Sequence, residues 1–176
     1  PFVNTAGARP EIWSYGIRNP QGMAMNPWSD ALWLNEHGPR GGDEINIPEK
    51  GKNYGWPMAT HGINYSGLKI PEAKGEHVEG TEKPLFVWKV SPAVSGMAFY
   101  NSDVFPQWKN KLFIGALKEK DVIVLSVKGN TVTEDGRILG DKDQRIRDVR
   151  VGPDGYLYVL TDETDGQLWK VSPSGS

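Results

Sequence analysis

Short apolar runs that follow polar turns recur along the chain and predict β-strands. The clearest runs lie at residues 31–35, 111–116 and 156–160. Each is rich in aromatic or branched side chains and follows a turn that contains Pro, which is the pattern expected of a β-hairpin. No stretch combines 3.6-residue periodicity with the caps of a long helix. The chain is therefore expected to be all-β.

The order of these runs repeats about three times. An apolar segment precedes each turn, at 22–26, 96–101 and 148–152, and two of the strands are followed by a further run, at 122–127 and 167–171. Repeats of about 40–50 residues built from several short strands indicate propeller blades. A β-sandwich is the alternative, but the repeated order favours the propeller. Since propellers typically have about four to eight blades, three blades indicate that the remainder is missing or comes from another copy.

Composition excludes several classes of function. The 176 residues carry a net charge of −2 with scattered Lys and Arg, which gives no electrostatic footprint for nucleic acid. The absence of Cys excludes disulfides and thiolate metal sites. No apolar run is long enough for a membrane span. The start at Pro1 lacks an initiator Met, so the chain is expected to be processed or truncated.

Arg18 and Asn19 lie immediately before the first strand of a blade. Propeller loops at that end face the central channel, where ligands usually bind. A guanidinium beside an amide offers donors for a carboxylate or a carbonyl oxygen. The alternative is a structural loop in which Arg18 binds backbone carbonyls, and this segment alone does not separate the two.

An acidic loop at residues 35–46 is a candidate calcium site. It brings Glu36, Asp43 and Glu44 together with the free carbonyls of a Gly-rich turn, and Ca²⁺ takes six to eight oxygen ligands. The EF-hand pattern is absent, and acids clustered in a loop are more often solvated. His37 could be a ligand or a general base, although a lone His more often hydrogen-bonds its neighbours.

Basic residues elsewhere predict an anion site. Residues two apart in an extended chain point to one side, so Arg145 and Arg147 can converge on one anion while Ile146 faces away, with Asp148 placed to orient one of them. Lys118 occupies a comparable position in another blade. The alternative is a pair of surface arginines on an edge strand. Equivalent loops of different blades meet at the channel mouth, so the propeller favours the anion site.

Several motifs in the right order resemble the soluble aldose sugar dehydrogenases, relatives of soluble glucose dehydrogenase that use pyrroloquinoline quinone (PQQ). They are Gly-Ile-Arg-Asn-Pro-Gln-Gly (16–22), Glu-His-Gly-Pro-Arg-Gly-Gly-Asp-Glu-Ile-Asn (36–46), Gly-Lys-Asn-Tyr-Gly-Trp-Pro (51–57) and Arg-Ile-Arg-Asp (145–148), with residues 152–162 matching the C-terminal blade. The resemblance covers nearly the whole chain and is closest to the enteric bacterial members. It implies a six-bladed β-propeller, of which residues 1–176 supply roughly the C-terminal three blades, with an insertion loop at about 58–84.

The same resemblance implies the cofactor site. Arg18 is expected near the quinone oxygens, where it offsets the negative charge that develops. The other implied PQQ contacts are Asn19, Tyr65, Ala116, Leu117, Lys118, Arg145, Ile146 and Arg147. Glu44 and the backbone carbonyl of Tyr54 are expected to hold a structural Ca²⁺. The carbonyls of Gly38 and Pro39 are expected to reach the Ca²⁺ that PQQ chelates.

The implied reaction is oxidation of an aldose at C1 to the lactone, with hydride passing to the quinone and electrons to an external acceptor. The family's general-base His lies in an N-terminal blade before this chain begins, and His37, His61 and His77 do not replace it. The chain alone is therefore predicted to be inactive without the N-terminal half of the propeller. A periplasmic location is implied, and homodimerisation stays open.

Two other functions compete with this interpretation. The first is a non-catalytic propeller that serves as a sugar- or protein-binding platform, since propellers host many functions. The second is a β-sandwich lectin that uses the acidic loop for Ca²⁺. The convergence of Arg18, Lys118, Arg145 and Arg147 favours the dehydrogenase, because a protein-binding platform has no reason to aim four cations at one point.

Overall fold

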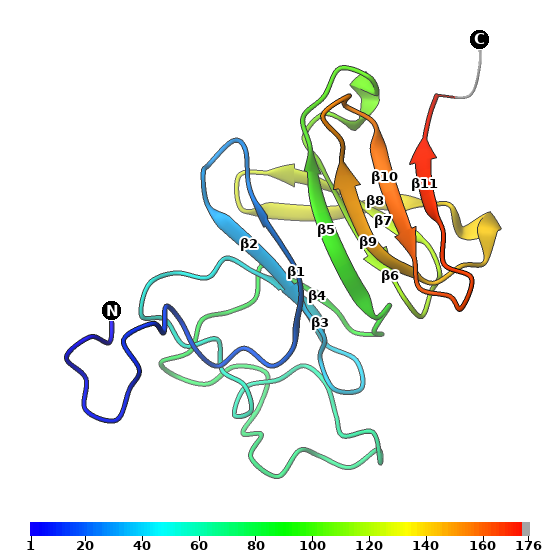
Figure 1. Ribbon diagram of the computed structural model, residues 1–176. Helices are drawn as coiled ribbons and strands as arrows, with labels where there is room; N and C mark the ends of the chain where they lie inside the picture. Colours follow the sequence, from blue (N-terminus) through cyan, green and yellow to red (C-terminus); the bar gives the residue numbers. More distant parts are fainter. Residues whose placement is uncertain (174–176) are drawn as a thin grey trace.

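The computed structural model describes residues 1–173 and contains three antiparallel β-sheets (Figure 1). The first sheet consists of β1 (Pro20–Met25), β2 (Leu32–Glu36), β3 (Asp43–Asn46) and β4 (Phe86–Trp88). The second consists of β5 (Val94–Tyr100), β6 (Lys111–Ala116), β7 (Val122–Lys128) and β8 (Thr131–Ile138). The third consists of β9 (Ile146–Val151), β10 (Leu157–Thr161) and β11 (Leu168–Val171). Two short 3₁₀ helices are η1 (Pro106–Trp108) and η2 (Gly140–Lys142).

Each sheet has the up-and-down order of a propeller blade. Its strands follow one another in chain order, each antiparallel to the one before. The first strands of the three sheets, β1, β5 and β9, pack side by side and form the inner edge of the blades (Figure 1). This arrangement confirms the predicted all-β propeller with three blades and excludes a sandwich of two facing sheets. The first two blades each have a fourth strand that the repeat did not predict.

Glycine and hydrogen bonds let the inner strands of neighbouring blades approach closely. A Cβ atom at Gly22 of β1 would lie 2.6 Å from the Ser95 carbonyl oxygen, and Gly96 of β5 is equally confined against β9. The Asn35 side chain donates a 2.9 Å hydrogen bond to that same carbonyl. The Ser95 hydroxyl in turn donates to the Ile146 carbonyl at 2.7 Å. The recurring Gly-Met-Ala sequences therefore mark contacts between blades.

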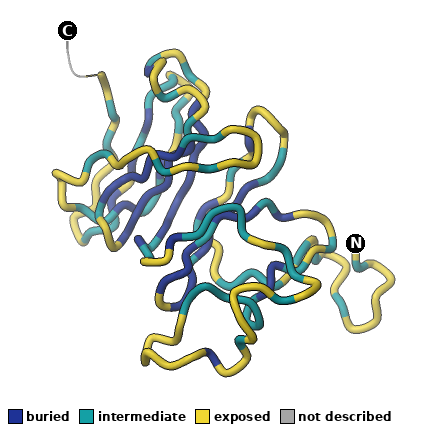
Figure 2. The backbone as a smooth tube through the Cα atoms, turned by 180° about the vertical axis from the view of Figure 1, so that it is seen from behind, coloured by how far each residue is buried: buried dark blue, intermediate teal, exposed yellow. Residues whose placement is uncertain are grey.

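The core lies between the blades. One buried cluster joins the first and second blades, and it includes Trp33, Ile45, Met97, Leu112, Ile114 and Ile123. The other joins the second and third blades, and it includes Tyr100, Phe113, Val124, Val149, Leu157 and Val159. Figure 2 shows the buried backbone running through the sheets while most loops are exposed. Burial of these apolar faces, at about 25 cal/mol per Å², fixes the blades as one scaffold for their loops.

A long loop at residues 47–85 separates β3 from β4. It carries the predicted insertion at about 58–84 and contains only isolated β-bridges, at Asn53, Ile63, Ala59 and Gly75. Figure 1 shows it extending from one end of the first blade. Within residues 1–173, no helix is long and apolar enough to cross a membrane.

Candidate functional site

The topology gathers the predicted cofactor residues at one end of the blades. The inner strands β1, β5 and β9 all start at the lower end of Figure 1 and lead into turns at the upper end. Segments that precede an inner strand, or follow its antiparallel neighbour, therefore meet at the lower end. These segments carry Arg18, Asn19, Gly38, Pro39, Ala116, Leu117, Lys118 and Arg145.

Arg18 forms hydrogen bonds to the turn that follows β2. Its Nη1 donates to the carbonyls of His37 at 3.1 Å and Gly38 at 3.0 Å. Its guanidinium also lies 5.2 Å from the ring centroid of Trp56. Arg18 therefore does bind backbone carbonyls, as the structural alternative expected. Its Nε is nevertheless buried without a partner among the described residues, and an unpaired buried donor costs about 1–3 kcal/mol. A bound oxygen acceptor would relieve that cost.

Glu36 holds the loop that carries Arg18 and Asn19. Its Oε2 accepts hydrogen bonds from the backbone N–H of Arg18 at 2.5 Å and of Asn19 at 3.1 Å. Its Oε1 accepts from the Asn46 side chain at 3.1 Å. Sequence reasoning placed Glu36 among the acids of a calcium loop and missed this anchoring role, which depends on a contact 17 to 18 residues away.

Glu36 and Glu44 form a buried acidic pair. They lie opposite each other on β2 and β3, and Asn46 Nδ2 also donates to Glu44 at 2.9 Å. Burial raises the pKa of Glu44 to about 8, and the charge of Glu36 adds to the rise. Burial also raises the pKa of Glu36. A cation bound between the two carboxylates would stabilise their charged forms.

A small cavity beside this pair has room for an ion. It has a volume of about 20 Å³ and borders Arg18, Glu36, His37, Gly38, Pro39, Gly42, Glu44, Tyr54, Trp56, Ala59 and Thr60. About 10–15 Å³ suffices for one water-sized sphere. Asn46 Oδ1 is buried and has no partner among the described residues. Two carboxylates and an unpaired amide oxygen are the hard oxygen donors that Ca²⁺ prefers.

Other calcium ligands would have to come from the backbone. Within residues 1–173, no three His, Cys, Asp or Glu side chains are grouped to hold a metal ion. The Tyr54 hydroxyl donates to the Ile47 carbonyl and accepts from the Glu49 N–H at 2.9 Å. Its hydroxyl is thus occupied, so the metal contact that the family resemblance implies for Tyr54 could come only from the backbone carbonyl and stays a prediction.

A second, wider cavity lies on the other side of Pro39. It has a volume of about 820 Å³ and is lined by Pro39, Arg40, Gly41, Ile63, Tyr65, Gly67, Lys89, Val90, Ser91, Ala93 and Lys118. Ligand pockets typically measure about 300–1,000 Å³. The structure thus brings three residues predicted to contact the cofactor and its calcium, Pro39, Tyr65 and Lys118, around one space.

Arg145 lies close to Lys118, because it binds the backbone of the preceding residue, Leu117. Lys118 Nζ donates to the Ser91 carbonyl at 3.2 Å and pairs with Glu119 at 3.1 Å. Arg145 Nη1 donates to the carbonyl of Leu117 at 3.4 Å. The second and third blades therefore contribute cations to the same end of the structure.

Arg145 and Arg147 converge on one anion, as their spacing predicts, but that anion is Asp162. Both guanidinium groups bind its carboxylate, with Nη2–Oδ2 distances of 2.9 and 3.0 Å. Hydrogen bonds from Arg147 and Arg145 lower the pKa of Asp162. The prediction that Asp148 orients one of them is wrong, because Asp148 pairs with Arg150 at 2.9 Å. The sequence could have indicated Asp162, because it follows the apolar run 156–160 in the same way as Lys118 follows the run 111–116.

Three predicted contacts have side chains that face the core. Ala116 and Ile146 are 0% exposed and Leu117 is 5% exposed. Ile146 faces away from the two arginines, as expected, and its carbonyl already accepts from Ser95. These residues can reach a cofactor only through the backbone, so their contacts stay predictions.

The histidines are engaged within the protein. His37 Nε2 lies 2.5 Å from the Val94 carbonyl and forms part of the wall between two blades. His61 lies 3.5 Å from Glu76 and its ring centroid is 5.5 Å from that of His77, all in the long loop.

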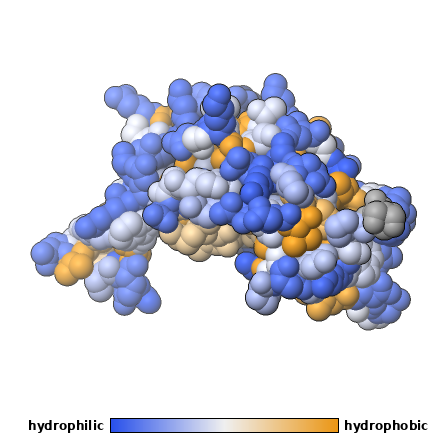
Figure 3. All heavy atoms as spheres, turned by 90° about the horizontal axis from the view of Figure 1, so that it is seen from above, coloured by the Kyte–Doolittle hydropathy of each residue, from blue (hydrophilic) through white to orange (hydrophobic). Residues whose placement is uncertain are grey.

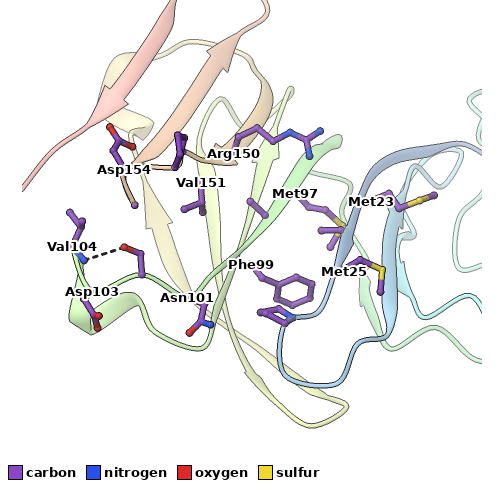
Figure 4. Close-up of a pocket in the computed structure, with 17 residues that line it drawn as sticks. Met23, Met25, Met97, Phe99, Asn101, Asp103, Val104, Arg150, Val151 and Asp154 are labelled. Carbon is purple, nitrogen blue, oxygen red and sulfur yellow. Dashed lines mark hydrogen bonds between the residues drawn. The ribbon is translucent and has the colours of Figure 1, made fainter.

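The opposite end of the blades contains none of the predicted site residues. It has its own cavity of about 820 Å³, lined by Met23 and Met25 of β1, Met97 and Phe99 of β5, and Arg150 of β9 (Figure 4). Figure 3 views the molecule from this end, where hydrophilic residues cover most of the surface between separate hydrophobic patches. The candidate chemistry is thus confined to the lower end.

Comparison with known proteins assigns the family. Residues 1–170 match the glucose/sorbosone dehydrogenase family. The chain belongs to this family. It is 82% identical over 173 residues to the aldose sugar dehydrogenase YliI of Escherichia coli, covering 98% of this chain and 47% of that protein. It is 28% identical to quinoprotein glucose dehydrogenase B of Acinetobacter calcoaceticus, covering 93% of this chain and 45% of that protein.

Solved structures agree with this assignment. The soluble aldose sugar dehydrogenase of Escherichia coli in the apo-form superposes with a TM-score of 0.97 at 80% identity, over 99% of this chain and 50% of that one. The PQQ-bound aldose sugar dehydrogenase of Streptomyces coelicolor superposes with a TM-score of 0.68 at 25% identity, over 90% of this chain and 44% of that one. The chain spans about half the length of these relatives. Three blades on half of that length correspond to the predicted six-bladed propeller.

Proposed function

We propose that this chain is part of a PQQ-dependent dehydrogenase that oxidises aldoses at C1 to lactones. Glucose/sorbosone dehydrogenases act on sugars, and the relatives above include a quinoprotein and a PQQ-bound enzyme. The observation that carries the proposal is the gathering of Arg18, Lys118, Arg145 and Arg147 at the calcium-compatible end of the blades.

PQQ fits this set of donors because it is a polycarboxylate. Asp162 uses part of the donor capacity of Arg145 and Arg147, but each guanidinium has five N–H groups and both side chains remain about 40% exposed. Lys118 adds a third cation at the edge of the wider cavity. When bound, the quinone supplies the hydride acceptor. Arg18 would stabilise negative charge that develops beside the turn it holds.

Calcium fits the acidic pair and its surroundings. Glu44, with the Tyr54 carbonyl, would hold a structural ion, and the buried Asn46 Oδ1 is available as a further donor. The Gly38 carbonyl accepts from Arg18 but keeps a second lone pair, so it and the Pro39 carbonyl would face a second ion at the cofactor. Bound Ca²⁺ supplies Lewis acidity toward the quinone. The general-base His, an external electron acceptor and a periplasmic location belong to the same proposal for the whole enzyme.

The test compares the full-length gene product with the 176-residue chain. With PQQ, Ca²⁺ and a dye acceptor, the full-length protein is expected to oxidise aldoses, whereas the chain alone shows no turnover because the base lies elsewhere. A full-length protein that is inactive on every aldose tested, or that leaves the PQQ absorbance unchanged, would refute the proposal. Turnover by the isolated chain would refute the assignment of the base.

A further inference from the structure

Asp43 is a fully buried carboxylate between the first and second blades. It begins β3 and is 0% exposed, and the hydrogen bonds that it accepts within residues 1–173 come from three neutral donors. One donor lies in the turn after β2, and the other two lie at the entry to β5. Because a buried polar group is costly unless it is hydrogen-bonded, these three donors fix the position of the Asp43 side chain between the two blades.

One side of Asp43 holds the turn after β2. Its Oδ1 accepts a hydrogen bond from the Gly38 N–H at 3.1 Å, while the carbonyl of Gly38 accepts from Arg18 at 3.0 Å. The turn is also tightly packed, because a Cβ at Gly38 would lie 2.1 Å from the Gly41 carbonyl oxygen. Asp43 and Arg18 thus bind the N–H and the carbonyl of Gly38, respectively, and fix the orientation of this residue just before Pro39.

The other side of Asp43 holds the entry to the second blade. Its Oδ2 accepts from the Ser91 hydroxyl at 2.7 Å and from the Val94 N–H at 3.1 Å. The Ser91 carbonyl accepts from Lys118 at 3.2 Å. Ser91, Lys118 and Pro39 also line the same wide cavity. One carboxylate therefore links the two walls of that cavity.

We infer that Asp43 is a positioning residue that sets the spacing between the Gly38–Pro39 carbonyls and Lys118. Pro39 and Lys118 line the same wide cavity, where the proposed ligand would combine a divalent cation with carboxylates. The inference rests on the proposed function and adds a residue that contacts neither metal nor cofactor. Partners of this kind typically change metal affinity about 10–100-fold, because charge-assisted hydrogen bonds orient the ligands.

The test uses Asp43→Asn in the full-length protein. Asn has nearly the same volume, but its amide NH₂ cannot accept the hydrogen bonds that one carboxylate oxygen accepts. Calcium is titrated in the presence of PQQ, followed by PQQ absorbance and by calorimetry. We expect the calcium midpoint to rise about 10–100-fold, with turnover at saturating calcium changed only a few-fold.

The matched control is Asn26→Ala at the opposite end of the first blade. Asn26 is also buried, 2% exposed, and its side chain accepts from the Trp28 N–H at 2.9 Å. This variant is expected to lower the melting temperature and leave the calcium midpoint unchanged. A purely structural Asp43 would behave in the same way.

The outcomes separate the two levels of the proposal. An unchanged calcium midpoint in Asp43→Asn, beside a normal wild type, overturns the positioning role and leaves the function standing. A wild type that binds neither PQQ nor calcium overturns both. If Asp43→Asn does not fold, Ser91→Ala removes one of the three donors and is expected to raise the midpoint several-fold. No change in that variant also overturns the role.

Discussion

The buried Glu36–Glu44 pair makes the metal-free protein less stable as the pH rises from about 4.5 to about 8. The pKa of Glu44 rises from 4.5 to about 8 because the side chain is buried. The unfolded chain therefore releases this proton near pH 4.5, whereas the folded protein keeps it until about pH 8. The stabilising contribution of the protonated group is complete below pH 4.5 and is lost as the pH rises towards 8. Burial of Glu36 acts in the same direction.

The size of the effect follows from linkage. Each pH unit between the two pKa values costs about 1.4 kcal/mol, so the free energy of unfolding is expected to fall by about 3 kcal/mol between pH 5 and pH 7. Urea unfolding in EDTA at several pH values measures this slope in the full-length protein. Glu44→Gln is expected to flatten it, because the neutral amide cannot ionise. Saturating Ca²⁺ is expected to flatten it as well, because the ion binds the ionised pair.

The quantity to compare is the slope of the free energy of unfolding against pH, taken as the difference between Glu44→Gln and the wild type. Burial lowers the pKa of His61 from its ordinary value of 6.5, so His61 contributes the opposite slope, and the difference removes its effect. Glu72→Gln serves as a control, since this exposed acid lies in the same long loop and is expected to keep the wild-type slope. Equal slopes in EDTA for Glu44→Gln and the wild type would refute the reasoning.

Two further predictions concern the cofactor clamp and the blade contacts. In the full-length enzyme, Arg145→Ala with Arg147→Ala is expected to weaken PQQ binding at least 10-fold, since each hydrogen bond to a charged group contributes about 1.5–3 kcal/mol. Arg150→Ala is the control. An unchanged PQQ titration in the double variant would rule out a role of the two arginines in binding the cofactor. Gly96→Val is expected to destabilise the protein by about 1–3 kcal/mol or more in urea unfolding, because a Cβ there would lie 2.7 Å from Asp148 Cα; an unchanged midpoint would refute the close packing of the inner strands.

Local sequence patterns predicted the strands that form within hairpins. The runs at 31–35, 111–116 and 156–160 became β2, β6 and β10 with small shifts at their ends. Their apolar side chains and preceding turns lie within a few residues, so the signal is local. The same reasoning missed β4, which has three residues and pairs with β3 across about 40 intervening residues. Its pairing depends on a contact that no local pattern encodes.

The site divides in the same way. Residue types and spacing marked Arg18, the acidic loop and the arginine pair as candidates, because donor chemistry and side-chain alternation are properties of the sequence. They left structural alternatives open, and the expected roles came from the family resemblance. The sequence did not predict the partner of the arginines. Asp148 is adjacent in sequence, whereas Asp162 is brought beside them by the pairing of β9 and β10.

The sequence by itself thus determined which donor and acceptor groups the protein carries. The tertiary structure determined which of these groups lie close together. Gly, Pro and apolar repeats specified blades, and the motifs specified the family. Only the packing of β1, β5 and β9, all running in one direction, placed loops more than 100 residues apart at one end. Only that packing enclosed Asp43 between two blades. The physical reason is that desolvation and hydrogen-bond direction depend on neighbours in space, which the chain acquires when the blades close on one another.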